Sequence, residues 1–334
     1  MSNKVELGAL ETRCRELLRD LGLAEANELI EVVPLSGGVA SDIARVKVAQ
    51  QTYCVKFALP KLKVAADWHV PVHRSQAECA WFRFAASILP SCVPHVFGQS
   101  ELGFVMEYFS PDDTVVWKES LLNKAPEIQH AQSVAVAIGQ IHRESTRSDH
   151  CRRTFRNHDD FLAIRIEPYL TFTASKHPSF SRHLSGIGSR LFRSSAALVH
   201  GDVSPKNILF RHNRPILLDA ECASMGDPAF DVAFCLNHLL LKSIHLPKFR
   251  SELLLAALEF WFAYSKFIDW EPRGELEARV AELLPALLLA RVDGKSPVEY
   301  LSSSNRKLVR SMAVSLLSDA PSSLPELLEV VRQR

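Results

Sequence analysis

One stretch near the middle of the 334-residue chain, residues 198–221, constrains its fold and chemistry more than any other. Two short apolar runs, Asn-Ile-Leu-Phe and Pro-Ile-Leu-Leu, flank a turn-rich Arg-His-Asn-Arg segment, and this pattern predicts a β-hairpin. Asp202 stands five residues before Asn207, and Asp219 follows the second apolar run. The hairpin therefore places carboxylate and amide side chains close to the ends of its two strands.

These side chains are the ones that phosphoryl transfer requires. The reaction needs a carboxylate that takes the proton from the attacking hydroxyl, and oxygen ligands that hold Mg²⁺ on the nucleotide phosphates. The spacing of Asp202 and Asn207 is that of the catalytic loop of kinases. We therefore predict that Asp202 is the catalytic base and that Asn207 and Asp219 are metal ligands.

The residues around this motif point to a family. His-Gly-Asp at Asp202 and Asp-Ala-Glu at Asp219 differ from the His-Arg-Asp and Asp-Phe-Gly of eukaryotic protein kinases. Together with the Gly-Asp-Pro-Ala-Phe-Asp run at residues 226–231, they resemble the aminoglycoside phosphotransferase / choline kinase superfamily. The resemblance implies an α+β, protein-kinase-like fold of two lobes, an ATP cofactor with Mg²⁺, and a small-molecule hydroxyl substrate.

The order of the elements agrees with two lobes. A helical pattern at residues 5–23 precedes three strand-like runs and a second helical pattern at residues 74–89, whereas the chain after about residue 115 is mostly helical apart from the hairpin. We expect an N-terminal ATP-binding lobe, an antiparallel sheet plus helix, in residues 1–109. A mainly helical, catalytic and substrate-binding lobe is expected in residues 110–334.

The first lobe contains candidates for binding the nucleotide. Ser36, Gly37 and Gly38 lie between two strands, where backbone amides approach phosphates, although most such glycine pairs are only turns. Lys56 stands inside an apolar strand, and its charge suits the α- and β-phosphates if an acidic partner holds it. Glu78, on the following helix, is that partner. The alternative is an edge-strand lysine whose amine lies in solvent.

Other roles follow from the resemblance alone. It places the adenine edge against backbone groups near Glu107 and Phe109, in a segment like the hinge of kinases. It makes His200 a packed residue that supports the catalytic loop, and it has Asp231 bonding the backbone near that loop. Glu221 either binds the metal or supports its ligands, and we favour support.

The acceptor is the least defined part. The run after Lys56, Phe-Ala-Leu-Pro followed by a tryptophan-containing loop, resembles 5-methylthioribose kinases and makes a methylthioribose-like sugar one candidate. An amino alcohol or an aminoglycoside-like compound are others. Arg291 is a candidate substrate contact, but it also lies where a helix ends at Gly294, so a structural role is equally open.

Composition and charge limit the classes of function and the cellular locations that remain. A net charge of +1 gives no bulk field that favours nucleic acid or a membrane, and no apolar run is long enough to span one. Seven scattered cysteines without a Cys-x-x-Cys pair, and no signal peptide, predict free thiols in the cytoplasm.

The amphipathic leading helix makes a homodimer possible. A protein kinase and a nucleotide-binding pseudokinase scaffold remain as alternatives to a small-molecule kinase.

Overall fold

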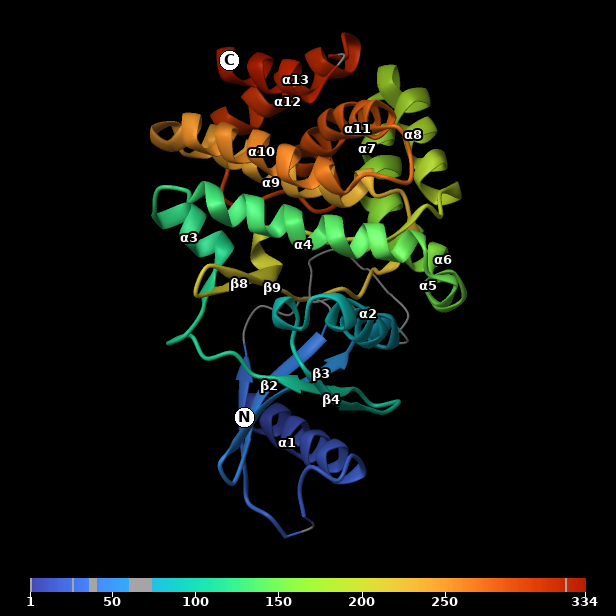
Figure 1. The fold of residues 1–334 in the computed structure, drawn as a ribbon. Coiled ribbons are helices and arrows are strands. Elements are labelled where there is room, and N and C mark those ends of the chain that lie inside the picture. Colours follow the sequence, from blue (N-terminus) through green and yellow to red (C-terminus); the bar gives the residue numbers. More distant parts are fainter. Residues whose placement is uncertain (1, 26, 36–40, 60–73, 322) are drawn as a thin grey trace. The chain divides into compact units, whose positions relative to one another are not determined.

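A computed structural model of the chain describes residues 2–25, 27–35, 41–59, 74–321 and 323–334 and shows a mixed α+β architecture. The chain divides into two compact units, Met1–Thr114 and Val115–Arg334 (Figure 1). This division lies five residues beyond the boundary expected from the sequence, because the coil after β5 stays with the first unit. In the described residues, no helix has the length and apolar character needed to cross a bilayer.

The first unit is an antiparallel sheet with strand order β1-β2-β3-β5-β4. Its elements are α1 (Ser2–Asp20), β1 (Ile30–Leu35), β2 (Ser41–Val48), β3 (Gln51–Ala58), α2 (Arg74–Ile88), η1 (Pro90–Cys92), β4 (Val96–Gln99) and β5 (Phe104–Glu107). β3 lies between β2 and β5, and its residues 53–57 are buried without alternation. Such a pattern belongs to a strand covered on both faces.

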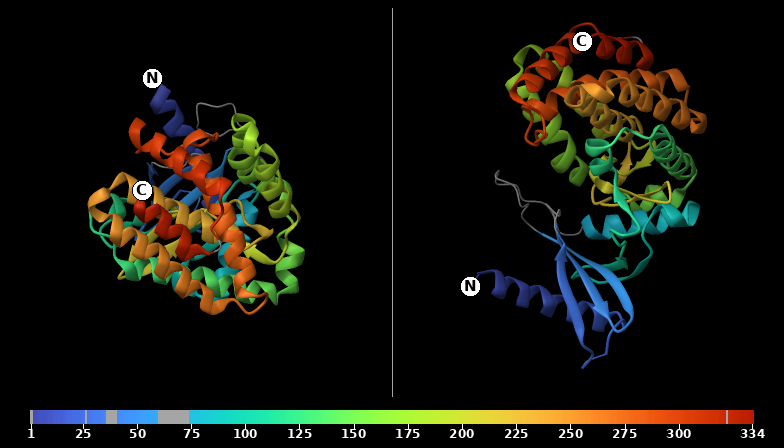
Figure 2. Two further views of the ribbon diagram at one scale, coloured as in Figure 1. Left: turned by 90° about the horizontal axis from the view of Figure 1, so that it is seen from above. Right: turned by 90° about the vertical axis from the view of Figure 1, so that its left-hand side faces the viewer.

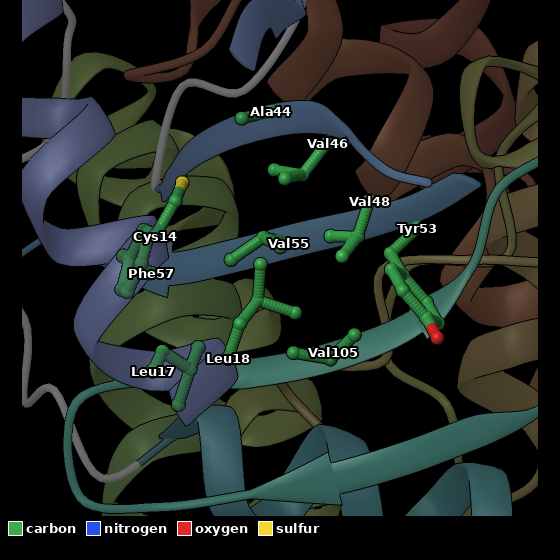
Figure 3. Packing of buried hydrophobic residues seen from close by; sticks show 10 residues of the cluster. All are labelled: Cys14, Leu17, Leu18, Ala44, Val46, Val48, Tyr53, Val55, Phe57 and Val105. Carbon is green, nitrogen blue, oxygen red and sulfur yellow. The ribbon is translucent and has the colours of Figure 1, made fainter. Parts of the chain in front are cut away.

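The leading helix covers one face of this sheet. α1 lies across the strands (Figure 2), and its side chains Cys14, Leu17 and Leu18 pack in one cluster with the strand residues Val46 and Val55 (Figure 3). The three α1 residues recur at the three-to-four-residue spacing of one helix face and are fully buried. The amphipathic pattern of the N-terminus is therefore explained by packing within the unit, and it no longer argues for a dimer.

The second unit is mainly helical. Its longer helices are α3 (Trp117–Asn123), α4 (Ile128–Thr146), α8 (Ser181–Arg193), α9 (Ala229–His245), α10 (Arg250–Tyr264), α11 (Arg273–Asp293), α12 (Ser303–Ser318) and α13 (Leu324–Gln333). Shorter ones are α5 (Asp149–Thr154), α6 (His158–Phe161), α7 (Phe172–Lys176), η3 (Pro178–Phe180), η4 (Pro205–Asn207), η5 (Pro247–Phe249) and η6 (Ser265–Phe267). α9 is buried over nearly its whole length and packs against α10 and α11. It is the central element of this unit.

Two small sheets in the second unit carry the sequence motifs. β6 (Val115–Val116), β8 (Ile208–Arg211) and β9 (Arg214–Leu217) form one, and β7 (Ala197–Val199) pairs with β10 (Ser224–Gly226) in the other. β8 and β9 are the predicted hairpin. His212 and Asn213 at its tip both have positive φ, as the favoured two-residue hairpin turn demands.

A segment of the second unit has neither α-helical nor 3₁₀-helical geometry. η2 (Leu162–Thr171) is a π-helix that contains Pro168. Proline has no N–H to donate, so the ordinary ladder is interrupted there, and the amide of Phe172 bonds the carbonyl of Glu167, five residues back. π-Helical turns occur often at functional sites. This one carries Arg165.

Candidate active site

The loop between β7 and β8 carries Asp202 and depends on a glycine. Gly201 has a φ of +80°, a conformation that L side chains rarely adopt. A Cβ at this position would lie 2.8 Å from Cβ of Cys222 and 3.0 Å from its carbonyl oxygen. Both the backbone angle and the close approach require glycine, which explains the residue before Asp202 in the His-Gly-Asp motif.

Asp231 fixes the backbone of the same loop through its carboxylate. Its two carboxylate oxygens accept hydrogen bonds from the amides of His200, at 2.7 Å, and Gly201, at 2.8 Å. The backbone contact expected of Asp231 is thus present. His142 contacts the same carboxylate at 3.1 Å through Nε2, and its Nδ1 lies 2.9 Å from the hydroxyl of Tyr264. These buried side chains form one network that fixes the backbone before Asp202.

His200 ties this loop to the end of the hairpin. Its Nδ1 accepts the amide hydrogen of Asp202 at 3.1 Å, and its Nε2 lies 3.1 Å from the carbonyl oxygen of Leu218. Nδ1 is therefore an acceptor and Nε2 the donor, the arrangement of a neutral ring. Burial lowers the pKa of His200 and favours the same form. This geometry suits a supporting residue and leaves neither nitrogen available as a base.

Asp202 is an ionised carboxylate held by two cations. It is 5% exposed, and its Oδ2 lies 3.0 Å from Nη2 of Arg165 and 3.2 Å from Nζ of Lys206. Burial alone would raise the pKa of Asp202, but the charges of Lys206 and Arg165 outweigh it and hold that pKa well below the usual carboxyl range. A carboxylate of this kind orients a hydroxyl strongly and accepts its proton only late in the reaction.

The two predicted metal ligands lie next to each other. The amide of Leu218, the residue before Asp219, donates to the carbonyl oxygen of Asn207 at 2.8 Å. The side-chain nitrogen of Asn207 donates to the backbone oxygen of Asp202 at 3.2 Å, which orients its amide. Asp219 has a φ of +67°, a strained angle for a residue with a side chain, and such strain concentrates at functional sites.

This donor set fits Mg²⁺. Within the residues that the structure describes, no three His, Cys, Asp or Glu side chains converge as a metal-binding group. Mg²⁺ at kinase sites does not need one, because it uses one or two protein oxygens and takes the rest from phosphates and water. Asn207 and Asp219 offer those oxygens. Glu221, which is buried two residues further on, belongs to the same turn.

In the first unit, Lys56 and Glu78 form a buried ion pair. Nζ of Lys56 lies 2.9 Å from Oε1 and 2.8 Å from Oε2 of Glu78, and the two side chains are 5% and 1% exposed. The alternative reading of Lys56 as a solvent-exposed lysine on an edge strand is wrong, since β3 is a central strand. A buried pair joining β3 to α2 fixes the position of the ammonium.

The other nucleotide candidates remain predictions. Glu107 ends β5, and its amide bonds the carbonyl oxygen of His95 at 2.8 Å. Phe109 follows in the coil. Ser36, Gly37 and Gly38 lie outside the described residues, as does most of the segment that resembles 5-methylthioribose kinases.

Arg165 is the residue that sequence reasoning left without a role. From η2 it contacts Asp202, and its Nε donates to the carbonyl oxygen of Gly201, so one guanidinium binds both the loop backbone and the carboxylate. It is buried, and its Cζ lies 5.8 Å from the ring centroid of Phe234. One sequence feature could have pointed to a role for Arg165: it is a cation within the apolar run Leu-Ala-Ile-Arg-Ile, which is followed by Pro168.

Arg291 lies near the end of α11 and is also buried. Its Nη1 donates at 3.1 Å to the hydroxyls of Tyr169 and Ser296, so part of the guanidinium has a structural function. Gly294 does not have the left-handed conformation expected of a helix-ending glycine. It is required because a Cβ would lie 2.4 Å from the carbonyl oxygen of Ala290.

Comparisons with known proteins show which sequences and folds the chain is similar to. Residues 31–276 match the model of a family described as the phosphotransferase enzyme family. This match includes both the Lys56–Glu78 pair and the Asp202 loop. No curated protein matches the chain.

Solved structures show which fold is shared. A choline/ethanolamine kinase family protein from Mesorhizobium loti is 18% identical, with a TM-score of 0.56 over 98% of this chain and 99% of the other. An ethanolamine kinase of Plasmodium vivax is 12% identical, with a TM-score of 0.57 over 90% and 86%. An amicoumacin kinase, solved in complex with AMP-PNP, Ca²⁺ and Ami, is 14% identical, with a TM-score of 0.57 over 92% and 93%. At these identities the likeness shows a common fold.

Proposed function

Because this chain belongs to the phosphotransferase enzyme family and is an enzyme of the small-molecule kinase type, we propose that it moves the γ-phosphate of ATP to a hydroxyl of a small metabolite. The observation that carries the proposal is the state of Asp202, a buried carboxylate kept ionised beside the Asn207 amide. Candidate acceptors are a sugar such as methylthioribose, an amino alcohol, or an aminoglycoside-like compound.

Asp202 acts on the acceptor. Its Oδ2 is paired with Arg165 and Lys206, so Oδ1 accepts the hydrogen bond of the attacking hydroxyl and orients the hydroxyl oxygen toward the γ-phosphorus. As the new O–P bond forms and the bond between the γ-phosphorus and the bridging oxygen breaks, ADP leaves and the hydroxyl proton passes to Asp202. The low pKa of Asp202 makes this proton transfer late, so positioning supplies most of the acceleration.

Asn207 and Asp219 hold the divalent cation, with Glu221 as support. Bound Mg²⁺ neutralises charge on the β- and γ-phosphate oxygens. The amicoumacin kinase that was solved with an ATP analogue and Ca²⁺ shares the fold and supports this assignment. In the first unit, Lys56 contacts the α- and β-phosphates, and Glu78 keeps its ammonium in place.

The alternatives are less well supported. A protein kinase needs an activation segment after the metal-binding turn, but here Asp219 and the start of α9 are separated mainly by β10, which is paired with β7. A pseudokinase scaffold lacks a catalytic residue, whereas this chain has a residue of suitable chemistry at each position that we assign a catalytic role. The seven cysteines are free, buried thiols, and we place the protein in the cytoplasm on that ground.

The test is ADP release by the purified protein with Mg·ATP against a panel of hydroxylated metabolites and a protein acceptor. The Asp202→Asn variant removes the carboxylate. The control variant Asp319→Asn makes the same change at an exposed position of the second unit. Turnover that survives in Asp319→Asn and is lost in Asp202→Asn supports the proposal. Phosphate transfer to the protein acceptor alone would favour the protein-kinase alternative.

A further inference from the structure

Three basic side chains gather in the second unit apart from the residues assigned above to ATP and Mg²⁺. His238 and Lys242 lie one turn apart on α9, and Arg291 lies on α11, which packs against α9. All three are buried, and Lys242 is only 1% exposed. Burial and the charge of Arg291 hold the pKa of His238 well below its ordinary value, so His238 is a neutral hydrogen-bonding ring beside two cations. We call Lys242 and Arg291, with the neutral His238 beside them, the cationic cluster.

The cluster has no acidic partner in the part of the chain that the structure describes. Lys242 donates no hydrogen bond and forms no ion pair with any described residue, and its Nζ lies 5.1 Å from the ring centroid of Tyr300. Nε of Arg291 and the hydroxyl of Tyr300 are buried and also lack a hydrogen-bond partner. Lys242, Nε of Arg291 and the hydroxyl of Tyr300 therefore have no hydrogen-bond acceptor among the described residues.

The carboxylate of Glu299 does not supply this acceptor. Its charge acts on Lys242, but Glu299 is exposed and already paired with Lys118, whose own charge acts against the protonated form of Lys242. Burial, aided by Lys118 and Arg291, lowers the pKa of Lys242 to about 7. Buried charges in proteins are normally paired, because an uncompensated one costs several kcal/mol. The presence of an unpaired buried ammonium at Lys242 therefore indicates a functional role for this side chain.

The cluster is continuous with the Asp202 site. Arg165, which pairs with Asp202, lies over the ring of Phe234, and this ring contacts His238 with 5.3 Å between the centroids. Lys242 follows one turn later. Phe234 and Lys242 are eight residues apart, which corresponds to about 12 Å along α9. Lys242 therefore lies about two helical turns along α9 from the aromatic ring that packs on Arg165.

We propose that the cationic cluster binds an anionic group, a carboxylate or a phosphate, at the end of the acceptor that lies away from the reacting hydroxyl. This inference rests on the proposed function, and it names the class of the acceptor. An anion would accept hydrogen bonds from Lys242, Nε of Arg291 and the hydroxyl of Tyr300. The same cluster repels choline-like and aminoglycoside-like cations.

A binding experiment tests the cluster without relying on turnover. Lysine labelled with ¹³C at Cε gives a signal for Lys242 that the Lys242→Met variant identifies. Inorganic phosphate is titrated at constant ionic strength into protein saturated with Mg·AMP-PNP, so that the nucleotide site is filled. We expect a saturable shift of the Lys242 signal in the wild type. Calorimetric titration, which does not need that signal, should give an affinity for phosphate at least about tenfold weaker in Lys242→Met, a loss of ~1.4 kcal/mol. An unmoved Lys242 signal would overturn the inference.

An acceptor experiment separates this inference from the proposed function. ADP release is compared for glycerate, glycerol 3-phosphate, glycerol and choline, which present a hydroxyl with different charges. The inference expects higher kcat/KM for the anionic compounds and loss of this preference in Lys242→Met, while the exposed control Lys248→Met keeps it. Preference for carboxylate over phosphate, or the reverse, identifies the group. Turnover of choline alone would refute the inference and leave the kinase assignment intact.

Discussion

Replacing Lys242 by methionine should stabilise this protein. The substitution keeps the length and apolar stem of the side chain and removes an ammonium that has no ion-pair partner among the described residues. Folding lowers the pKa of Lys242 from its ordinary 10.5 to about 7. At ~1.36 kcal/mol for each pH unit, the buried charge costs roughly 5 kcal/mol as an upper bound. We expect a measured gain of about 2 kcal/mol, because local relaxation lowers the cost.

The pH dependence of this gain has a definite sign. Below pH 7 the folded and unfolded chains both carry the proton, so the folded state bears the full cost of the buried charge. Between pH 7 and 10.5 the unfolded chain binds more protons than the folded one, and stability rises with pH. The advantage of Lys242→Met is therefore largest below pH 7 and declines toward pH 10.5.

Calorimetric unfolding of wild type and Lys242→Met at several pH values measures this gain, with Lys248→Met as an exposed control. Added inorganic phosphate should narrow the difference, since it binds the wild-type folded state. The reasoning is refuted if Lys242→Met is less stable than wild type below pH 7, or if Lys248→Met shows the same gain.

Four further outcomes are expected. Asp202→Asn should lower kcat by ~10²–10⁴-fold, measured by ADP release, and calorimetry should show a lower melting temperature because the buried Arg165 loses its carboxylate partner. Lys56→Met should raise the KM for ATP by about tenfold or more, because a fixed phosphate contact is lost. Asp231→Ala leaves two loop amides and His142 without their acceptor, and denaturant unfolding should show a loss of ~3 kcal/mol. Gly201→Ala should lower the stability by ~2 kcal/mol in the same assay, because of its positive φ and the contact with Cys222.

Local patterns predicted much of the fold. The hairpin, the leading helix and the α2 helix were readable because each has its own periodicity and turn residues. β4 begins only at Val96, since Pro94 has no N–H to offer a ladder. α9 begins at Ala229, whose amide donates to the carboxylate of Asp227, and Asp231 in its first turn binds the loop instead.

The candidate site was predictable only where residues are close in sequence or match the motif order. Asp202, Asn207 and Asp219 come from one stretch, and the contact between Lys56 and Glu78 follows from a known order of elements. Arg165 and the cationic cluster come from η2, α9 and α11, which only the tertiary fold brings together. No local sequence pattern indicates that Lys242, on an apolar helix, lacks an ion-pair partner.

The central claim is transfer of phosphate to a hydroxyl with Asp202 as the acceptor of its proton. It is tested most directly by ³¹P NMR of the reaction products of Mg·ATP and the acceptor panel with wild type, Asp202→Asn and Asp319→Asn. The account predicts a new phosphomonoester signal, stoichiometric with ADP, in wild type and Asp319→Asn and its loss in Asp202→Asn. The same phosphomonoester formed at an equal rate by Asp202→Asn would contradict it.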